Sequence, residues 1–163
     1  MGCDIHLFIQ YKSIVGDEWE DFGGRIRVTR DYNLFGQLVD GVRTSPGGFL
    51  ARGIPSDINR YNEAWTEFYD YIACPDEPNN VTEQQAINAG GTIYSDGYNR
   101  WTENSDLHSH SYLSTSEYEC ALQKRAELVQ YYTIPVAYKA VLSAMQTLNT
   151  YRHHVRIVFA FDN

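Results

Sequence analysis

Apolar and polar side chains alternate near both ends of the chain. Over residues 3–11 every second residue is apolar, beginning at Cys3, and the residues between them include Asp4 and His6. Residues 155–161 show the same period of two, which is typical of a β-strand that buries one face. We therefore predict that the N-terminal and C-terminal strands lie side by side in a small antiparallel sheet.

Between these strands, apolar residues at helical spacing predict five helices. They are expected at residues 31–40, 61–72, 82–89, 114–131 and 135–148. The predicted caps are Thr29 or Asp31 for the first helix, and the capping boxes Thr82–Gln85 and Ser114–Glu117 for the third and fourth. Two short strands are expected at 18–22 and 25–28, and two long loops at 43–56 and 92–112. Loops of this length inside a compact domain more often carry function than not.

The whole chain, residues 1–163, is predicted to form a single α+β domain. No linker divides it, and its 43% apolar and 21% charged residues exclude the disordered and collagen-like classes. The order of strands, helices and a final strand predicts a small antiparallel sheet packed with several helices and long loops.

Charge and cysteine content narrow the class of protein. The net charge of −8 disfavours binding to duplex nucleic acid or to an anionic membrane. The acidic excess lies in residues 1–105, while the rest has balanced charges and four of the five histidines, so a neutral or basic pocket remains possible there. The three cysteines are widely spaced, and neither a membrane span nor a secretory signal is evident. A cytoplasmic location is expected.

Two polar motifs are candidates for catalysis or metal binding. Asp4 and His6 share a strand face, where they suit a base with its orienting carboxylate, two metal ligands, or simply a surface ion pair. His108 and His110 form an H-x-H pair that suits one metal ion, or contact with a phosphate or a base. Candidate catalytic residues are therefore Asp4, His6, His108 and His110, and the three histidines are the candidate metal ligands.

The long loops supply candidate ligand-binding residues. Arg52 lies where a glycine and a proline fix the backbone around a guanidinium group, which suits a phosphate. Arg25 and Arg27 are expected instead to pair with the acidic run at residues 17–21. Aromatic residues gather near the histidines, where they suit stacking on a base or packing of the loop onto the domain. The candidate ligand-binding set is Arg52, Asp57, Tyr98, Trp101, His108, His110 and Tyr112.

Five motifs together resemble those of a family of small proteins encoded mainly by bacteriophages and prophages. They are MGCDIH at the start, RDYNLF at 30–35, RGIPSD at 52–57, HSHSYL at 108–113 and VRIVFAFDN at the end, and residues 58–105 match least. The resemblance implies a viral protein acting in a bacterial cytoplasm, and it brings no catalytic assignment. The family's marked positions would converge if the terminal strands are neighbours; they are Asp4, His6, Arg52, Asp57, His108, His110 and Asp162.

For such a protein we expect sequestration of a nucleotide signal of host defence, of the cyclic or ADP-ribose type, with arginine on the phosphate and aromatic rings on the base. The alternative is a phosphodiesterase-type hydrolase of such a nucleotide that uses a His/Asp site, with or without a metal. A further alternative is an inhibitor that contacts a host protein through its acidic surface. Sequestration requires no cofactor, and a homo-oligomer is expected, since sequestering proteins of this size often build sites between subunits.

Overall fold

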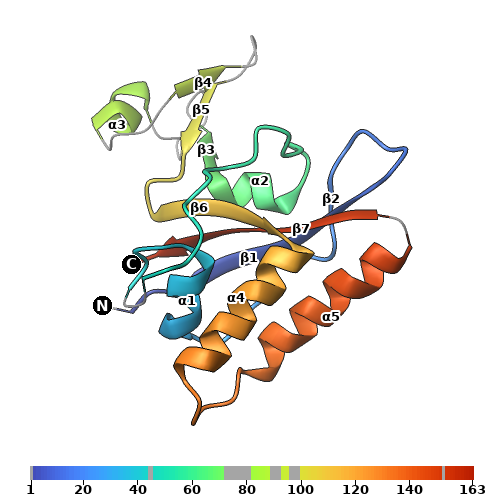
Figure 1. The fold of residues 1–163 in the computed structure, drawn as a ribbon. Helices are drawn as coiled ribbons and strands as arrows, with labels where there is room; N and C mark the ends of the chain where they lie inside the picture. Colours follow the sequence, from blue (N-terminus) through green and yellow to red (C-terminus); the bar gives the residue numbers. More distant parts are fainter. Residues whose placement is uncertain (1, 44–45, 72–81, 89–92, 96–99, 152) are drawn as a thin grey trace.

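The terminal strands form the centre of the main sheet. In the computed structural model, which describes residues 2–43, 46–71, 82–88, 93–95, 100–151 and 153–163, β1 (Ile5–Ser13) pairs antiparallel with β7 (His153–Asp162). β2 (Glu20–Asp21) and β6 (Leu107–Ser114) complete the order β2-β1-β7-β6 (Figure 1). The predicted α+β fold and the pairing of the two terminal strands are confirmed.

Helices cover both faces of this sheet. α1 (Tyr32–Leu38), α4 (Thr115–Leu128) and α5 (Val136–Thr150) lie on one face, and α2 (Glu63–Phe68) lies on the other (Figure 1). The larger core lies under the first three helices, and a smaller core under α2 consists of Phe8, Ala64, Phe68, Leu107, Val158 and Ala160. The second face of β1 is therefore buried as well, although the alternating pattern predicts only one buried face.

The predicted helix caps are confirmed. The Asp31 side chain accepts a hydrogen bond from the Leu34 amide at 3.0 Å and caps α1. Ser114 and Glu117 form a complete capping box at the start of α4. α3 (Glu83–Asn88) follows Thr82, which exchanges hydrogen bonds with Gln85. Each cap satisfies backbone N–H groups that have no partner inside the helix.

Strands replace the predicted loop at residues 92–112. β4 (Ile93–Ser95) and β5 (Arg100–Glu103) pair with each other, and the same segment continues into β6. β5 also pairs with β3 (Tyr69–Tyr71), so the helix predicted at 61–72 ends at Phe68, where the chain passes into this second sheet. The strand predicted at 25–28 is also wrong, since only one bridge, between Ile26 and Leu7, forms there.

Aromatic packing explains why the pattern missed this second sheet. Trp65 packs against Trp101 with ring centroids 5.4 Å apart, and Tyr69 packs against Tyr94 at 5.8 Å. These rings stabilise short strands whose sequence has no clear apolar alternation, because large aromatic side chains bury much surface even at isolated positions. Within the described residues, no helix is long and apolar enough to cross a membrane.

Candidate functional site

The face of the main sheet under α2 carries polar residues at both ends and apolar residues in the middle. Across β1 and β7, His6 lies opposite Ala160, Phe8 opposite Val158, and Gln10 opposite Arg156. His6, Gln10 and Arg156 are all at least nine-tenths buried. Because buried polar groups need partners, each end of this face has to satisfy its own polar side chains. The two ends do so in different ways.

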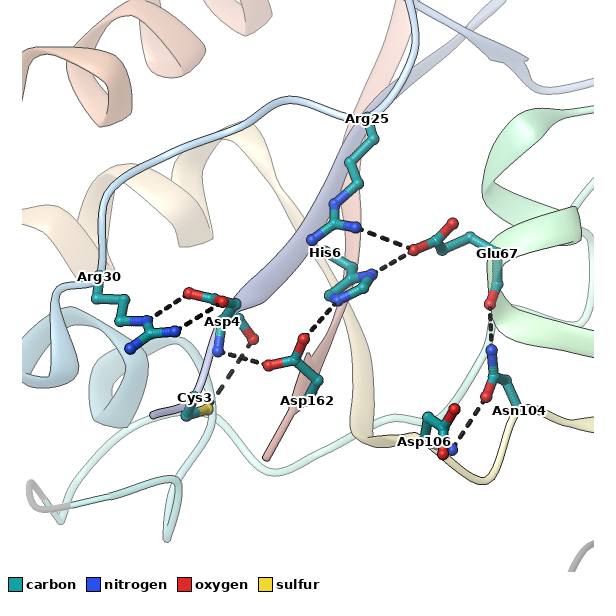
Figure 2. Close-up of polar contacts among 9 residues, drawn as sticks. All are labelled: Cys3, Asp4, His6, Arg25, Arg30, Glu67, Asn104, Asp106 and Asp162. Carbon is teal, nitrogen blue, oxygen red and sulfur yellow. Dashed lines mark hydrogen bonds and ion pairs between the residues drawn. The ribbon is translucent and has the colours of Figure 1, made fainter. Parts of the chain in front are cut away.

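At one end, carboxylates hold the His6 ring from both sides (Figure 2). Its Nδ1 atom bonds Glu67 of α2, and its Nε2 atom lies 3.0 Å from the Asp162 Oδ2 atom. Arg25 donates to the same Glu67 carboxylate at 3.3 Å, rather than to the acidic run at residues 17–21. We call His6, Glu67, Asp162 and Arg25 the His6 cluster. Both ring nitrogens therefore lie within hydrogen-bond distance of a carboxylate oxygen, which can accept a bond from a protonated ring nitrogen.

Asp4 belongs beside this cluster but does not orient His6. Its carboxylate pairs with Arg30 through two hydrogen bonds of 2.5 and 2.9 Å, and its backbone N–H donates to Asp162 at 2.7 Å (Figure 2). The bond from Arg30 lowers the pKa of Asp4. For Asp162, burial raises the pKa, but the hydrogen bonds from His6 and the Asp4 amide outweigh it, and the pKa is lowered overall. The structure thus brings Asp4, His6 and Asp162 together, with Asp162 rather than Asp4 bonded to the ring.

His108 and His110 lie on opposite faces of the sheet. A one-residue bulge separates His108 from Ser111, and Ser109 there has a φ of 53°. The His108 ring lies near Phe161 of the larger core, while His110 packs against Phe68 under α2. The bulge reverses the alternation of side chains. The predicted H-x-H pair therefore does not share a metal ion, and among the described residues no group of three or more potential ligands is arranged to hold one.

The two histidines also differ in environment. His110 is 7% exposed, burial lowers its pKa, and its Nε2 atom has no hydrogen-bond partner among the described residues. His108 donates to or accepts from Ser109 at 2.9 Å, and it lines a cavity of about 420 Å³ together with Asp106 and Asp162. His108 therefore borders this cavity, whereas His110 packs against Phe68 in the smaller core.

At the other end of the face, Arg156 borders a larger cavity of about 700 Å³. This cavity, which we call the Arg156 groove, lies between β7, the end of β6 and the start of α4; among its lining residues are Lys12, Trp19, Arg52, Tyr112, Glu117 and Arg156. Its volume falls in the range of about 300–1,000 Å³ typical of small-molecule sites. Two of the predicted ligand-binding residues, Arg52 and Tyr112, therefore lie on one cavity.

Arg156 is fixed in place but keeps one donor unused. Its Nε atom donates to Gln10 at 3.0 Å and its Nη1 atom to Asp57 at 2.7 Å, while the guanidinium group lies 3.8 Å from the centroid of the Trp19 ring. The Nη2 atom has no hydrogen-bond partner within the part of the chain that the structure describes. Asp57, predicted to contact ligand, instead holds Arg156 and the Trp19 ring nitrogen. Burial lowers the pKa of Arg156, although Asp57 opposes this shift.

Cations and aromatic rings alternate in a row that starts on the groove lining and continues past it to Phe49 and Lys124. The row runs Lys12, Trp19, Arg156, Tyr112, Arg52, Phe49 and Lys124, and each cationic group lies between 3.8 and 5.8 Å from the centroid of a neighbouring ring. Cation–π contacts attract a guanidinium group to the ring face and leave its N–H groups pointing outward in the plane. The row therefore positions cations without consuming all of their hydrogen-bond donors.

Arg52 is held by Glu117, the residue that also caps α4. Its terminal nitrogens donate to the Glu117 carboxylate at 2.9 and 2.5 Å, and Nη1 also donates to the Tyr112 carbonyl at 3.0 Å. The Arg52 hydrogen bond, followed by the contacts from Ser114, lowers the pKa of Glu117 to about 2. The Arg52 loop is bound to β6 through the Arg52 amide and Ser111, and Gly53 there has a φ of 76°. Arg52 thus lies in a fixed loop, as predicted.

Trp101, another of the predicted ligand-binding residues, lies away from the groove in the second sheet. Its ring packs against Trp65 and Tyr69, in agreement with the alternative that the aromatic residues pack the loop onto the domain. Tyr98 lies outside the described residues. Sequence reasoning missed Glu67, Trp19 and Arg156. Only Arg156 carried a signal, because the alternation of residues 155–161 places it on the face opposite the apolar positions.

No protein-family model, no curated protein and no solved structure matches this chain. The two polar ends of the sheet therefore provide the evidence on function. In the His6 cluster both ring nitrogens are bonded, although the Arg25 Nε atom has no partner among the described residues. The Arg156 groove combines the larger cavity, several cations on its lining and an Arg156 donor without a partner among the described residues.

Proposed function

We propose that the protein is a phage-type nucleotide-binding protein that sequesters a nucleotide signal of bacterial host defence in the Arg156 groove. The observation that carries this proposal is Arg156: a guanidinium group that is 6% exposed, borders a cavity of about 700 Å³ and retains a donor without a partner among the described residues. A buried donor without a partner costs about 1–3 kcal/mol. A phosphate oxygen that reached this donor would remove that cost.

The start of α4 supports the same placement of a phosphate. Ser114, Thr115 and Ser116 line the groove, so hydroxyl groups lie beside the N-terminus of a helix of 14 residues. The positive end of a helix dipole and its free N–H groups favour an anion. Tyr112, half-buried between Arg52 and Arg156, offers an aromatic edge to the rest of the nucleotide.

Sequestration fits the groove better than turnover does. The His6 ring has both nitrogens engaged by carboxylates, and His108 and His110 face opposite sides of the sheet. A general base must reach the proton that it removes. The hydrolase alternative rests on the smaller cavity, where His108 lies beside Asp106 and Asp162. That arrangement would use the opposite end of the sheet from the groove.

One experiment separates these functions. The pure protein is incubated with a panel of cyclic and ADP-ribose-type nucleotides, the free nucleotide is measured after filtration, and the protein is then denatured and the nucleotides are identified by chromatography. Depletion followed by recovery of intact nucleotide supports sequestration. Conversion to a product supports the hydrolase, and chelation or a His108→Ala variant then tests its site. If every nucleotide stays free and unchanged, the proposal is wrong and inhibition of a host protein takes its place.

Assembly is a separate part of the proposal. We expect a homo-oligomer, with copies of the groove brought together between subunits, and light scattering on the pure protein measures it. A monomer that still binds nucleotide would contradict this part alone.

A further inference from the structure

The charges around the Arg156 groove nearly cancel. Among the described residues that line it, three are cationic, Lys12, Arg52 and Arg156, and two are carboxylates, Glu117 and Glu119. These five side chains together carry one positive charge. Asp57 lies directly behind Arg156 at 2.7 Å, and the whole chain has a net charge of −8. The groove is thus a weakly positive site within a negative field, which opposes the approach of a ligand with several negative charges.

Glu117 already occupies the position on Arg52 that a second anionic group would need. Both terminal nitrogens of Arg52 face its carboxylate, an arrangement that a phosphate dianion would otherwise adopt. Glu117 also accepts from the Ser114 amide at 2.9 Å, so moving it away would break the capping box of α4. Arg52 is therefore neutralised within the fold, and of the described cations that line the groove Arg156 and Lys12 are left for a ligand.

We infer, on the basis of the proposed function, that the groove selects a nucleotide whose phosphate carries a single negative charge, a phosphodiester, over phosphomonoesters and polyphosphates. One phosphodiester oxygen meets the unused Nη2 donor of Arg156, and its single charge matches the single positive charge of the lining. A monoester or diphosphate brings additional negative charge that, among the described lining residues, only Lys12 is left to balance, beside the carboxylates Glu117 and Glu119. Of the two nucleotide types considered, this favours the cyclic type over the ADP-ribose type.

The test compares ligands that share base and sugar. Binding of 3′,5′-cyclic AMP, 5′-AMP and ADP is measured by calorimetry at about pH 8, where histidine in its usual range is uncharged and a phosphomonoester carries a charge of about −2. We expect 3′,5′-cyclic AMP to bind at least about tenfold more tightly than 5′-AMP, and ADP to bind more weakly than either. Equal or tighter binding of 5′-AMP would overturn the inference while leaving nucleotide binding intact. Failure of all three to bind, together with a negative nucleotide panel, would overturn both.

Two matched variants test the role of Glu117. Glu117→Gln keeps an oxygen for the Ser114 amide but frees Arg52, so it should raise the affinity for 5′-AMP about tenfold and reduce the preference for the cyclic form. Glu119→Gln removes the same charge from the groove lining without freeing Arg52, and it should shift the preference by much less. Equal effects of the two variants would mean that total charge alone, rather than release of Arg52, sets the preference, and would contradict the part assigned to Glu117. A thermal melt of each variant checks that it is folded.

Discussion

The His6 cluster and the Arg156 groove lie at opposite ends of one sheet face, and each centres on a buried cationic or protonatable side chain. In the His6 cluster, both ring nitrogens are bonded to carboxylates that other residues also hold, from Arg25 on one side to the Asp4 amide on the other. In the groove, Arg156 has two of its nitrogens bonded and a third without a partner among the described residues.

This difference separates a polar network that stabilises the fold from one suited to a ligand. The His6 cluster joins the first strand, the last strand and α2 through the two bonds of the His6 ring and the bond from Arg25 to Glu67. In the groove, Trp19 lies over the face of Arg156, and this contact takes up none of the N–H donors that lie in the plane of the guanidinium group. A buried donor without a partner among the described residues also occurs at Arg25, so the candidate binding site is marked by the larger cavity and by the cations that line it beside Arg156.

The largest expected effect comes from Arg156. Arg156→Gln should weaken binding of the best-retained nucleotide by about 10- to 150-fold, because a hydrogen bond involving a charged group contributes about 1.5–3 kcal/mol and about 1.4 kcal/mol corresponds to tenfold in affinity. Calorimetry gives the affinity and a thermal melt gives the stability. Arg27→Gln is the matched control, since it removes the same group from an exposed position outside the groove. Arg156→Lys should recover part of the binding; an Arg156→Gln variant that is folded and binds normally would mean that the groove is not the site.

In contrast to Arg156→Gln, removal of the His6 ring should lower the stability of the protein more than its affinity for a nucleotide. His6→Leu should lower the free energy of unfolding by about 2 kcal/mol, because it leaves Glu67 and Asp162 without the group that bridges them. Nucleotide affinity should change less than about threefold. Urea unfolding and calorimetry measure the two quantities, and Asp4→Asn, which breaks an exposed ion pair, should cost under about 1 kcal/mol. A large loss of binding with unchanged stability would move the candidate site to the His6 cluster.

The smallest effect is the pH dependence set by Glu117. Its pKa is lowered to about 2 by Arg52 and Ser114, so the unfolded chain takes up a proton on Glu117 at higher pH than the native protein does. Its contribution to stability is therefore present above the usual carboxyl range, near 4.5, and is lost as the pH falls through about 2. Glu117→Gln should be slightly less stable than the wild type at neutral pH, by under about 1 kcal/mol.

Urea unfolding at several pH values checks this sign. The difference between wild type and Glu117→Gln should shrink on acidification and vanish near pH 2. Glu127→Gln, an exposed substitution on the same helix, should show no such convergence. A difference that stays constant or grows in acid would mean that the ion pair with Arg52 does not stabilise the native state.

Much of the fold could be predicted because local patterns decide it. The alternation at residues 3–11 and 155–161 gives the two central strands, and Asp31 and the Ser114–Glu117 capping box give two helix starts. The second sheet was missed because aromatic side chains stabilise its short strands without alternation. The fixed loop around Arg52 was predicted from its glycine and proline, whereas its partner Glu117 was visible only as a capping residue.

The sequence by itself determined which residues form the terminal strands, where the main helices begin, and that polar side chains occupy one strand face. Only the tertiary structure decided what those side chains do. His6 meets a residue 156 positions away, and Arg156 meets Asp57 at a separation of 99. A single bulge after His108 sends the two histidines to opposite faces. Hydrophobic periodicity and helix capping act over a few residues, whereas strand register, a bulge and the placement of α2 set contacts between distant segments. Those contacts give both His6 ring nitrogens a partner and leave one Arg156 nitrogen without a partner among the described residues.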